Sequence, residues 1–269
     1  MKNGSFIRKI LFVGLLLVFF SCDKDEYSNN SPEGTASTGK DIVNPIIYGD
    51  EVEVGKGTVK SWISVDEFGK PLEIGIEMTP SVLENLPIDS DFEKTPIIPI
   101  PKEASVLTAF DHIGLNWNPD NYSTISGFKV PHFSVYFYLI SENERKGIPE
   151  WSEETDPLFS FYPPKNHMPA VYSPIDKAEG SLATIGRHWL NQYEGPLETH
   201  TLRLGTFNGR FAFVNPVVAL DFLKSEKKAN GSIPQGVENP SNNMLPREYH
   251  IYTNEKGNYS ISLGNFINR

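Results

Sequence analysis

One stretch near the middle of the chain constrains the fold more firmly than any other. From Val130 onward, apolar and polar side chains alternate: Phe133, Val135, Phe137 and Leu139 take one set of positions, and His132, Ser134, Tyr136 and Tyr138 take the other. Successive side chains of a strand point to opposite faces, so the pattern predicts a strand with an apolar core face and a polar, aromatic second face. A chain built around such a strand must form a sheet.

Turn signals elsewhere predict more antiparallel pairs. Residues 66–71 read as a turn between strands at 52–65 and 72–78, and Asn208-Gly209 suits a tight turn between strands at 198–204 and 210–214. A closing hairpin is predicted from 249–253 and 259–263. With 21 Gly, 21 Pro, 17 Phe and 11 Tyr, the composition also favours strands and turns.

We therefore expect a mainly β fold, a β-rich α+β domain with an antiparallel sheet or a barrel-like arrangement and a few short helices. Proline and capping signals place these helices at 81–86, after Thr79-Pro80, at the Ser141/Glu144 capping box, and at 217–224, after Pro216. The proline-dense segment 96–102 is expected at a sheet edge or in a crossing loop.

The first 21 residues have the pattern of a signal peptide. Lys2, Arg8 and Lys9 precede the apolar run Ile10–Phe20, which is too short for a typical membrane span. The end of the run resembles the lipobox of bacterial lipoproteins, which makes Cys22 the expected lipidated N-terminus. The alternative is an ordinary signal peptide with a leftover thiol. Cys22 is the only cysteine, so no intramolecular disulfide is expected.

The residues after Cys22 predict a tether and a location. The sequence Asp23-Lys24-Asp25-Glu26 resembles the surface-export signal of lipoproteins in a Gram-negative group, although a generic charged tether is the alternative. Residues 22–41 are polar and small, as in flexible linkers. We expect a single β-rich domain at 42–269, with a polar excursion near 225–245, on an outer-membrane lipoprotein exposed at the cell surface.

The charge of the chain argues against two classes of partner. The formal net charge is −10, and it becomes more negative once the basic leader is removed. Such a surface repels nucleic acid and anionic lipid. The lipid anchor is therefore the expected contact with the membrane.

Several motifs carry a resemblance to a known family. The segments FDHIGLNWNP, VPHFSVYFYLIS, GRHWLN and ETHTLRLGTF resemble an uncharacterised family of bacterial exported domains, a domain of unknown function, over roughly residues 55–223. In that family the central strand reads more like PHFDFHFY, and a further histidine follows the tryptophan. The matching positions here are Ser134, Tyr136 and Tyr122, so the resemblance implies a site with fewer polar groups in this chain.

The candidate site residues are His112, His132, Tyr136 and His188. A metal site needs His132 joined across strands by His112, His188 or His200, because no HxH, HxxxH or His/Cys cluster occurs in the sequence. The alternative is that these histidines are hydrogen-bonded structural residues, as we expect for His200, which shares a strand face with leucines. Tyr136 could stack against a ring or a sugar.

Two functions from different classes follow. The first is a non-catalytic domain that binds a small molecule, a glycan or a partner protein, or assembles with copies of itself. The second is a metal-dependent enzyme that uses the histidines and a divalent transition metal. Phosphate-loop, nucleophile-elbow and HExxH motifs do not occur in the sequence, so the motifs leave open whether the chain is catalytic.

Overall fold

The computed structural model describes residues 44–87, 96–121, 123–237 and 244–267. The predicted signal peptide, Cys22, the tether and Tyr122 lie outside the described residues. Residues Val43–Arg269 form one compact unit. Within the described ranges, none of the helices has the length and apolar composition needed to cross a membrane.

The first sheet has six strands, all paired antiparallel. Their order is β1 (Ile46–Val54), β2 (Gly57–Val65), β3 (Pro71–Met78), β14 (Tyr259–Gly264), β13 (Glu248–Thr253) and β12 (Ala229–Ser232). The predicted hairpins β2–β3 and β13–β14 are confirmed. The Asp66 carboxylate closes the first turn by accepting hydrogen bonds from the backbone nitrogens of Phe68 and Lys70. The predicted strand 52–65 is in fact two strands, because the chain turns at Gly55, whose φ is +59°.

The second sheet has eight strands and holds the central strand of the sequence. Its order is β4 (Ile97–Pro99), β5 (His112–Asn118), β6 (His132–Tyr138), β11 (Arg210–Ala219), β10 (His200–Phe207), β9 (Gly186–Asn191) and β7 (Tyr172–Pro174), with β8 (Ser181–Leu182) also paired to β9. The Asn208-Gly209 hairpin is confirmed. The prediction of an edge position for the segment 96–102 is also confirmed, because β4 is an outermost strand of the sheet.

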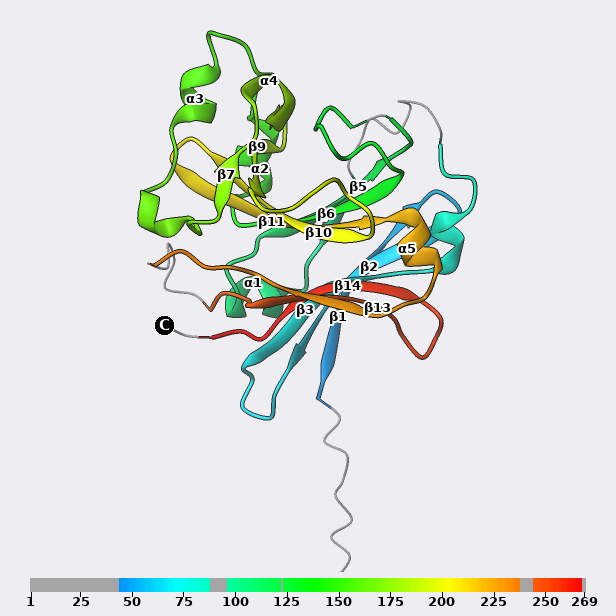
Figure 1. Ribbon diagram of the computed structural model, residues 1–269. Coiled ribbons are helices and arrows are strands. Elements are labelled where there is room, and N and C mark those ends of the chain that lie inside the picture. Colours follow the sequence, from blue (N-terminus) through cyan, green and yellow to red (C-terminus); the bar gives the residue numbers. More distant parts are fainter. Residues whose placement is uncertain (1–43, 88–95, 122, 238–243, 268–269) are drawn as a thin grey trace, which may run out of the picture. The chain divides into compact units, whose positions relative to one another are not determined.

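The two sheets stack face to face and share one apolar core (Figure 1). Phe133, Val135 and Phe137 of β6 enter this core from one side, and Ile74 and Ile76 of β3 enter it from the other. Burying a side chain of this size stabilises the fold by about 1.5–3 kcal/mol. The predicted β-rich class is confirmed, in the form of two open antiparallel sheets and not a closed barrel.

A third layer covers the outer face of the eight-stranded sheet, the face turned away from the six-stranded sheet. It contains α2 (Glu142–Lys146), α3 (Asp156–Ser160) and α4 (Lys177–Gly180), and Figure 1 shows α3 and α4 above β9, β10 and β11. The short helix η2 (Lys165–His167) lies instead beside the apolar core between the sheets, to which Met168 at its C-terminal end belongs. The predicted capping box of Ser141 and Glu144 opens α2. Because of this layer, every residue of β6 is buried, including the polar set that begins at His132.

The remaining helices lie at the ends of strands: η1 (Pro80–Leu83), α1 (Lys102–Leu107) and α5 (Leu220–Lys224). The helix predicted at 81–86 is a shorter 3-10 helix. The helix predicted to begin at Val217 was wrong at its start, since β11 continues to Ala219. Val217 and Val218 pair there with Ser134 and Phe133 of β6. These strand-pairing contacts keep the chain extended after Pro216, where the proline had predicted the start of a helix. Within the predicted polar excursion, Ala229–Ser232 forms the edge strand β12, and residues 238–243 lie outside the described residues.

Candidate functional site

A polar pocket of about 320 Å³ lies on the outer face of the eight-stranded sheet, beside the middle of β6. Its lining comes from β5, β6, β8, β10 and the loop after β5: Asn116, Asn118, Ser123, Thr124, Ile125, Tyr136, Leu182 and Arg203. Ligand sites in proteins occupy roughly 300–1,000 Å³, so this pocket suits a small molecule.

Arg203 is the only charged side chain in the lining of this pocket, and its orientation is fixed on three sides. Its Nε donates to Asn215 Oδ1 at 2.9 Å, and its Nη2 donates to Ser134 Oγ at 2.6 Å. The guanidinium carbon lies 4.8 Å from the centre of the Phe128 ring, within the range of a cation–π contact. The side chain is only 2% exposed. Neighbours from two strands and a loop therefore hold a buried cation at the pocket wall.

Asn215 is the support for this cation. Its own amide nitrogen donates to the carbonyls of Val135 at 3.0 Å and Pro216 at 3.2 Å, which leaves Oδ1 turned toward Arg203. Asn215 and Arg203 are direct cross-strand partners in β11 and β10. Within the described residues, no carboxylate lies within ion-pair distance of Arg203. Among the described residues, the groups that stabilise this positive charge are therefore neutral: two hydrogen-bond acceptors and the Phe128 ring.

Tyr136 links the pocket to His188. The Tyr136 hydroxyl lies 3.2 Å from His188 Nε2, and His188 Nδ1 lies 3.1 Å from the Gly180 carbonyl. A carbonyl only accepts, so Nδ1 carries the proton, and Nε2 accepts from the tyrosine. Burial, with the nearby charge of Arg203, holds the pKa of His188 well below its usual value. His188 is therefore a neutral, fully hydrogen-bonded imidazole, which positions Tyr136.

His132 lies on the same face at one end of β6 and is also neutral. Its Nδ1 lies 2.7 Å from the Val130 carbonyl, and its ring meets Phe128 edge to face. Burial first, and then the charge of Arg203, lower the pKa of His132 to about 4. Its Nε2 has no hydrogen-bond partner in the described part of the chain.

The structure does not bring the four predicted histidines together. His112 pairs with Tyr138 at the opposite end of β6 from His132, about 20 Å away at the rise of a strand. There, its Nδ1 lies 2.8 Å from Asp111 Oδ1, and its ring stacks on Tyr138. His200 lies between the sheets, where its Nδ1 is 2.9 Å from the Tyr249 hydroxyl of β13. The structural role expected for His200 stays a prediction, with which this hydrogen bond agrees.

Among residues 44–87, 96–121, 123–237 and 244–267, no group of three or more His, Cys, Asp or Glu side chains is placed to hold a metal ion. The metal-dependent alternative therefore gains no support from these positions and stays a prediction.

The mouth of the pocket is formed by the loop between β5 and β6. Thr124 is exposed there, and its hydroxyl donates to the Glu179 carbonyl at 3.1 Å. The backbone nitrogen of Ser126 donates to the Glu179 carboxylate at 3.0 Å. These bonds tie the loop to α4, so two segments more than 50 residues apart define the opening.

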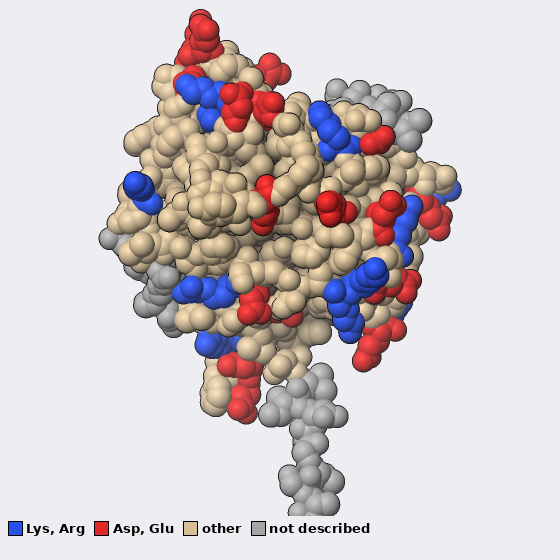
Figure 2. Space-filling model, viewed as in Figure 1, with Lys and Arg blue, Asp and Glu red and all other residues tan. Residues whose placement is uncertain are grey.

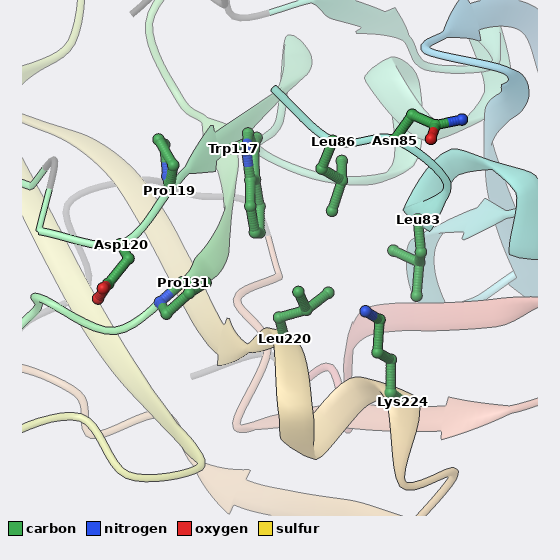
Figure 3. A pocket seen from close by; sticks show the side chains of 9 residues that line it. All are labelled: Leu83, Asn85, Leu86, Trp117, Pro119, Asp120, Pro131, Leu220 and Lys224. Carbon is green, nitrogen blue, oxygen red and sulfur yellow. The ribbon is translucent and has the colours of Figure 1, made fainter. Parts of the chain in front are cut away.

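A second pocket, of about 350 Å³, is mainly apolar and lies at the junction of η1, β5 and α5. Figure 3 shows Leu220 and Lys224 of α5 pointing toward Leu83, Leu86 and Trp117. Its charged side chains are Asp120 and Lys224, both at positions outside the buried core. The indole nitrogen of its one tryptophan already donates to the Pro87 carbonyl at 2.8 Å. The described lining of this second pocket contains no buried polar side-chain atom without a hydrogen-bond partner. The polar pocket is therefore the stronger candidate for a ligand site.

Figure 2 shows acidic and basic side chains interspersed over one face, without a continuous patch of either sign among the residues drawn in colour. The visible surface therefore selects no charged partner by itself. Recognition by charge, if it occurs, depends on the enclosed guanidinium.

Sequence reasoning placed Tyr136 and His132 on the polar face of the central strand and named His188 as a candidate without a face, but missed Arg203, Asn215 and Asn116. A signal for Arg203 was present: in the predicted strand 198–204 it alternates with Leu202 and Leu204, so it lies opposite their core face. Asn116 could not be assigned in this way, because its environment depends on the loop that follows β5.

Comparison with known proteins gives no relative from which a role could be transferred. No protein-family model matches the chain, and neither a curated protein nor a solved structure matches it. The resemblance to an uncharacterised exported family stays a prediction, and function must be argued from the pocket.

Proposed function

We propose that this protein is an exported, lipid-anchored binding domain and that the polar pocket on the outer face of its eight-stranded sheet holds a small polar ligand. The observation that supports binding most directly is the rigid lining of the pocket. Arg203 and Tyr136 are both buried, and hydrogen bonds to Asn215, Ser134 and His188 fix their positions. Side chains held in place before a ligand arrives lose little entropy on binding.

The same contacts favour binding over acid–base catalysis. General acid–base catalysis works best with a pKa near the operating pH. Burial lowers the pKa of both His132 and His188, and the two nitrogens of His188 are already engaged. These imidazoles are fixed, neutral groups that lie outside the lining of the pocket.

A pocket-blocking variant tests the binding function. Thr124→Trp places an indole at the mouth, where the native side chain is exposed, and Ser105→Trp adds the same indole at an exposed position in α1, outside the pocket and its mouth. A library of sugars and small metabolites is screened by ligand-observed NMR against the full chain. We expect ligands whose signals respond to the wild type and to Ser105→Trp but not to Thr124→Trp. A library without any ligand, or ligands that bind all three proteins equally, would contradict the proposal.

The anchor is tested separately. Cells grown with an alkyne-tagged palmitate should label the wild-type chain, and Cys22→Ser should abolish the label and release the protein from the membrane fraction. Replacing Asp23–Glu26 with neutral residues should remove the protein from the protease-accessible surface of intact cells while the label remains. A wild-type chain that never acquires the lipid would refute the anchor without affecting the pocket.

A further inference from the structure

The polar pocket contains one cation that nothing in the described part of the chain neutralises. Burying an unpaired charge costs several kcal/mol, so proteins rarely keep one without a partner. Resting on the binding function above, we propose that the ligand supplies that partner: a single carboxylate on a hydroxylated molecule, as in acidic sugars, which pairs with Arg203.

The guanidinium is oriented for such a pairing. Nε and Nη2 point to Asn215 and Ser134, whereas Nη1 has no acceptor among the described residues. Phe128 covers the guanidinium, so the remaining donors are confined to the directions that the pocket leaves open. Arginine donors in a planar fork match the two oxygens of a carboxylate.

The two buried imidazoles on this face add no charge to that of Arg203, and the Glu179 carboxylate at the mouth lies outside the lining. His132 and His188 are neutral because burial lowers the pKa of each, and neither contributes a second positive charge. The other lining side chains are uncharged. One positive charge is balanced by a monoanion, whereas a phosphate dianion would leave one negative charge buried without a partner.

The other polar side chains in the lining suit hydroxyl groups. Asn116 and Asn118 carry both a donor and an acceptor, and Ser123 and Tyr136 carry hydroxyls. The Tyr136 proton is directed to His188, so toward a ligand the phenol oxygen acts as an acceptor. The volume of about 320 Å³ lies at the small end of ligand sites, as expected for a single ring.

The chain contains a matched control. Arg187 in β9 is 3% exposed, has no described carboxylate at ion-pair distance, and donates from Nη2 to the Ile175 carbonyl at 2.5 Å. It does not line the polar pocket. Arg187→Met therefore removes a buried cation from the same sheet without touching the proposed site.

The experiment measures binding of glucuronate, galacturonate, glucose and glucose 6-sulfate to the full chain by NMR titration. We expect both hexuronates to bind the wild type and Arg187→Met alike, and glucose to bind far more weakly. Arg203→Met should weaken hexuronate binding by about 30-fold or more, the cost of removing one partner of a buried charge pair. Arg203→Lys keeps the positive charge but lacks the planar fork of donors, so its affinity for the hexuronates should lie between those of the wild type and Arg203→Met.

A second variant keeps the test valid if Arg203→Met does not fold. Asn116→Asp leaves Arg203 in place and adds a competing carboxylate to the pocket lining, and it should weaken hexuronate binding by about tenfold or more.

Preference for the sulfate ester would overturn the carboxylate assignment. Equal binding of glucose and hexuronates, or hexuronate binding that survives both Arg203→Met and Asn116→Asp, would overturn the role of Arg203 while the binding function stood. Failure of every hexuronate to bind would also refute the inference. The proposed binding function would be refuted only by the library screen described above.

Discussion

The hydroxyl of Tyr136 in β6 lies 3.2 Å from Nε2 of His188 in β9, although β11 and β10 separate the two strands in the sheet. Three strand spacings amount to about 14 Å, so the two side chains reach toward each other above the sheet. Phe213 of β11 lies beneath them, with its ring centre 5.1 Å from each of the two rings. The outer face is thus bound together across its width by one hydrogen bond over an aromatic ring.

Removing that hydrogen bond should destabilise the fold measurably. Tyr136→Phe leaves His188 Nε2 buried without a donor, and we expect the free energy of unfolding to fall by about 1–3 kcal/mol. Tyr138→Phe is the control on the same strand face, because the Tyr138 hydroxyl has no hydrogen-bond partner in the described part of the chain. Urea unfolding of both variants measures the difference. Equal losses would show that the Tyr136–His188 contact contributes little.

Comparing a single variant with a double variant should show that Arg203 destabilises the unliganded fold. Asn215→Leu alone removes one of the two hydrogen-bond acceptors of the buried guanidinium, and we expect a loss of about 3 kcal/mol. Adding Arg203→Met to Asn215→Leu removes the charge itself, so the double variant should unfold within about 1 kcal/mol of the wild type. The readout is chemical denaturation without ligand. A double variant less stable than Asn215→Leu would mean that the charge stabilises the fold.

The ring of Phe213 also determines the residue that β10 can carry beside it. A Cβ atom at Gly205 would lie 2.0 Å from Phe213 Cε1. We therefore expect Gly205→Ala to destabilise by about 1–3 kcal/mol, since the ring must shift within a packed layer. Gly195 is exposed and has no atom within 4 Å of the added carbon, so Gly195→Ala should change stability by less than about 0.5 kcal/mol. Similar thermal midpoints for the two variants would contradict the close packing at Gly205.

Acid should destabilise the domain through His132. The pKa of His132 is about 4 in the folded state, below the usual 6.5, so the unfolded chain takes up this proton first as the pH falls. The contribution to stability is complete above pH 6.5 and is lost between pH 6.5 and 4, by about 3 kcal/mol at ~1.4 kcal/mol per pKa unit.

His132→Gln removes this titration. The difference in unfolding free energy between the wild type and His132→Gln should therefore change with pH in the window between 6.5 and 4, and stay constant from pH 7 to 8. Denaturation at several pH values in both ranges checks the sign. A constant difference across the acid window would show that His132 is accessible to protons in the folded state.

The elements that sequence reasoning predicted correctly depend on local patterns. The alternation from Val130 fixed the apolar face of β6, and the turn residues around Asp66 and at Asn208-Gly209 fixed two hairpins. Each signal lies within about ten residues of the structure it specifies. The same reasoning failed at Val217, where pairing with β6, some 80 positions away in sequence, kept the chain extended beyond Pro216.

The site was only partly predictable for the same physical reason. A polar strand face such as that of Ser134 and Tyr136 ordinarily faces water, and nothing in the strand itself says that α3 and α4 will cover it. Arg203 looks like a solvated side chain until Ser134, 69 positions earlier, and Phe128 are placed beside it. Burial of a polar residue is decided by whatever packs over it, and here these segments are distant in sequence.

The six-stranded sheet has a consequence for the order of assembly. Its two middle strands, β3 and β14, come from opposite ends of the folded chain, and the Asn258 amide donates to Glu77 across 181 positions. β3 leaves the ribosome long before β14, so the β3 edge that pairs with β14 stays open while the intervening residues are made. Pairings between such distant segments form slowly, because a long loop must close first. In this architecture the core closes only when β14 has been made, and a chain truncated before β14 exposes an open strand edge for quality control to find.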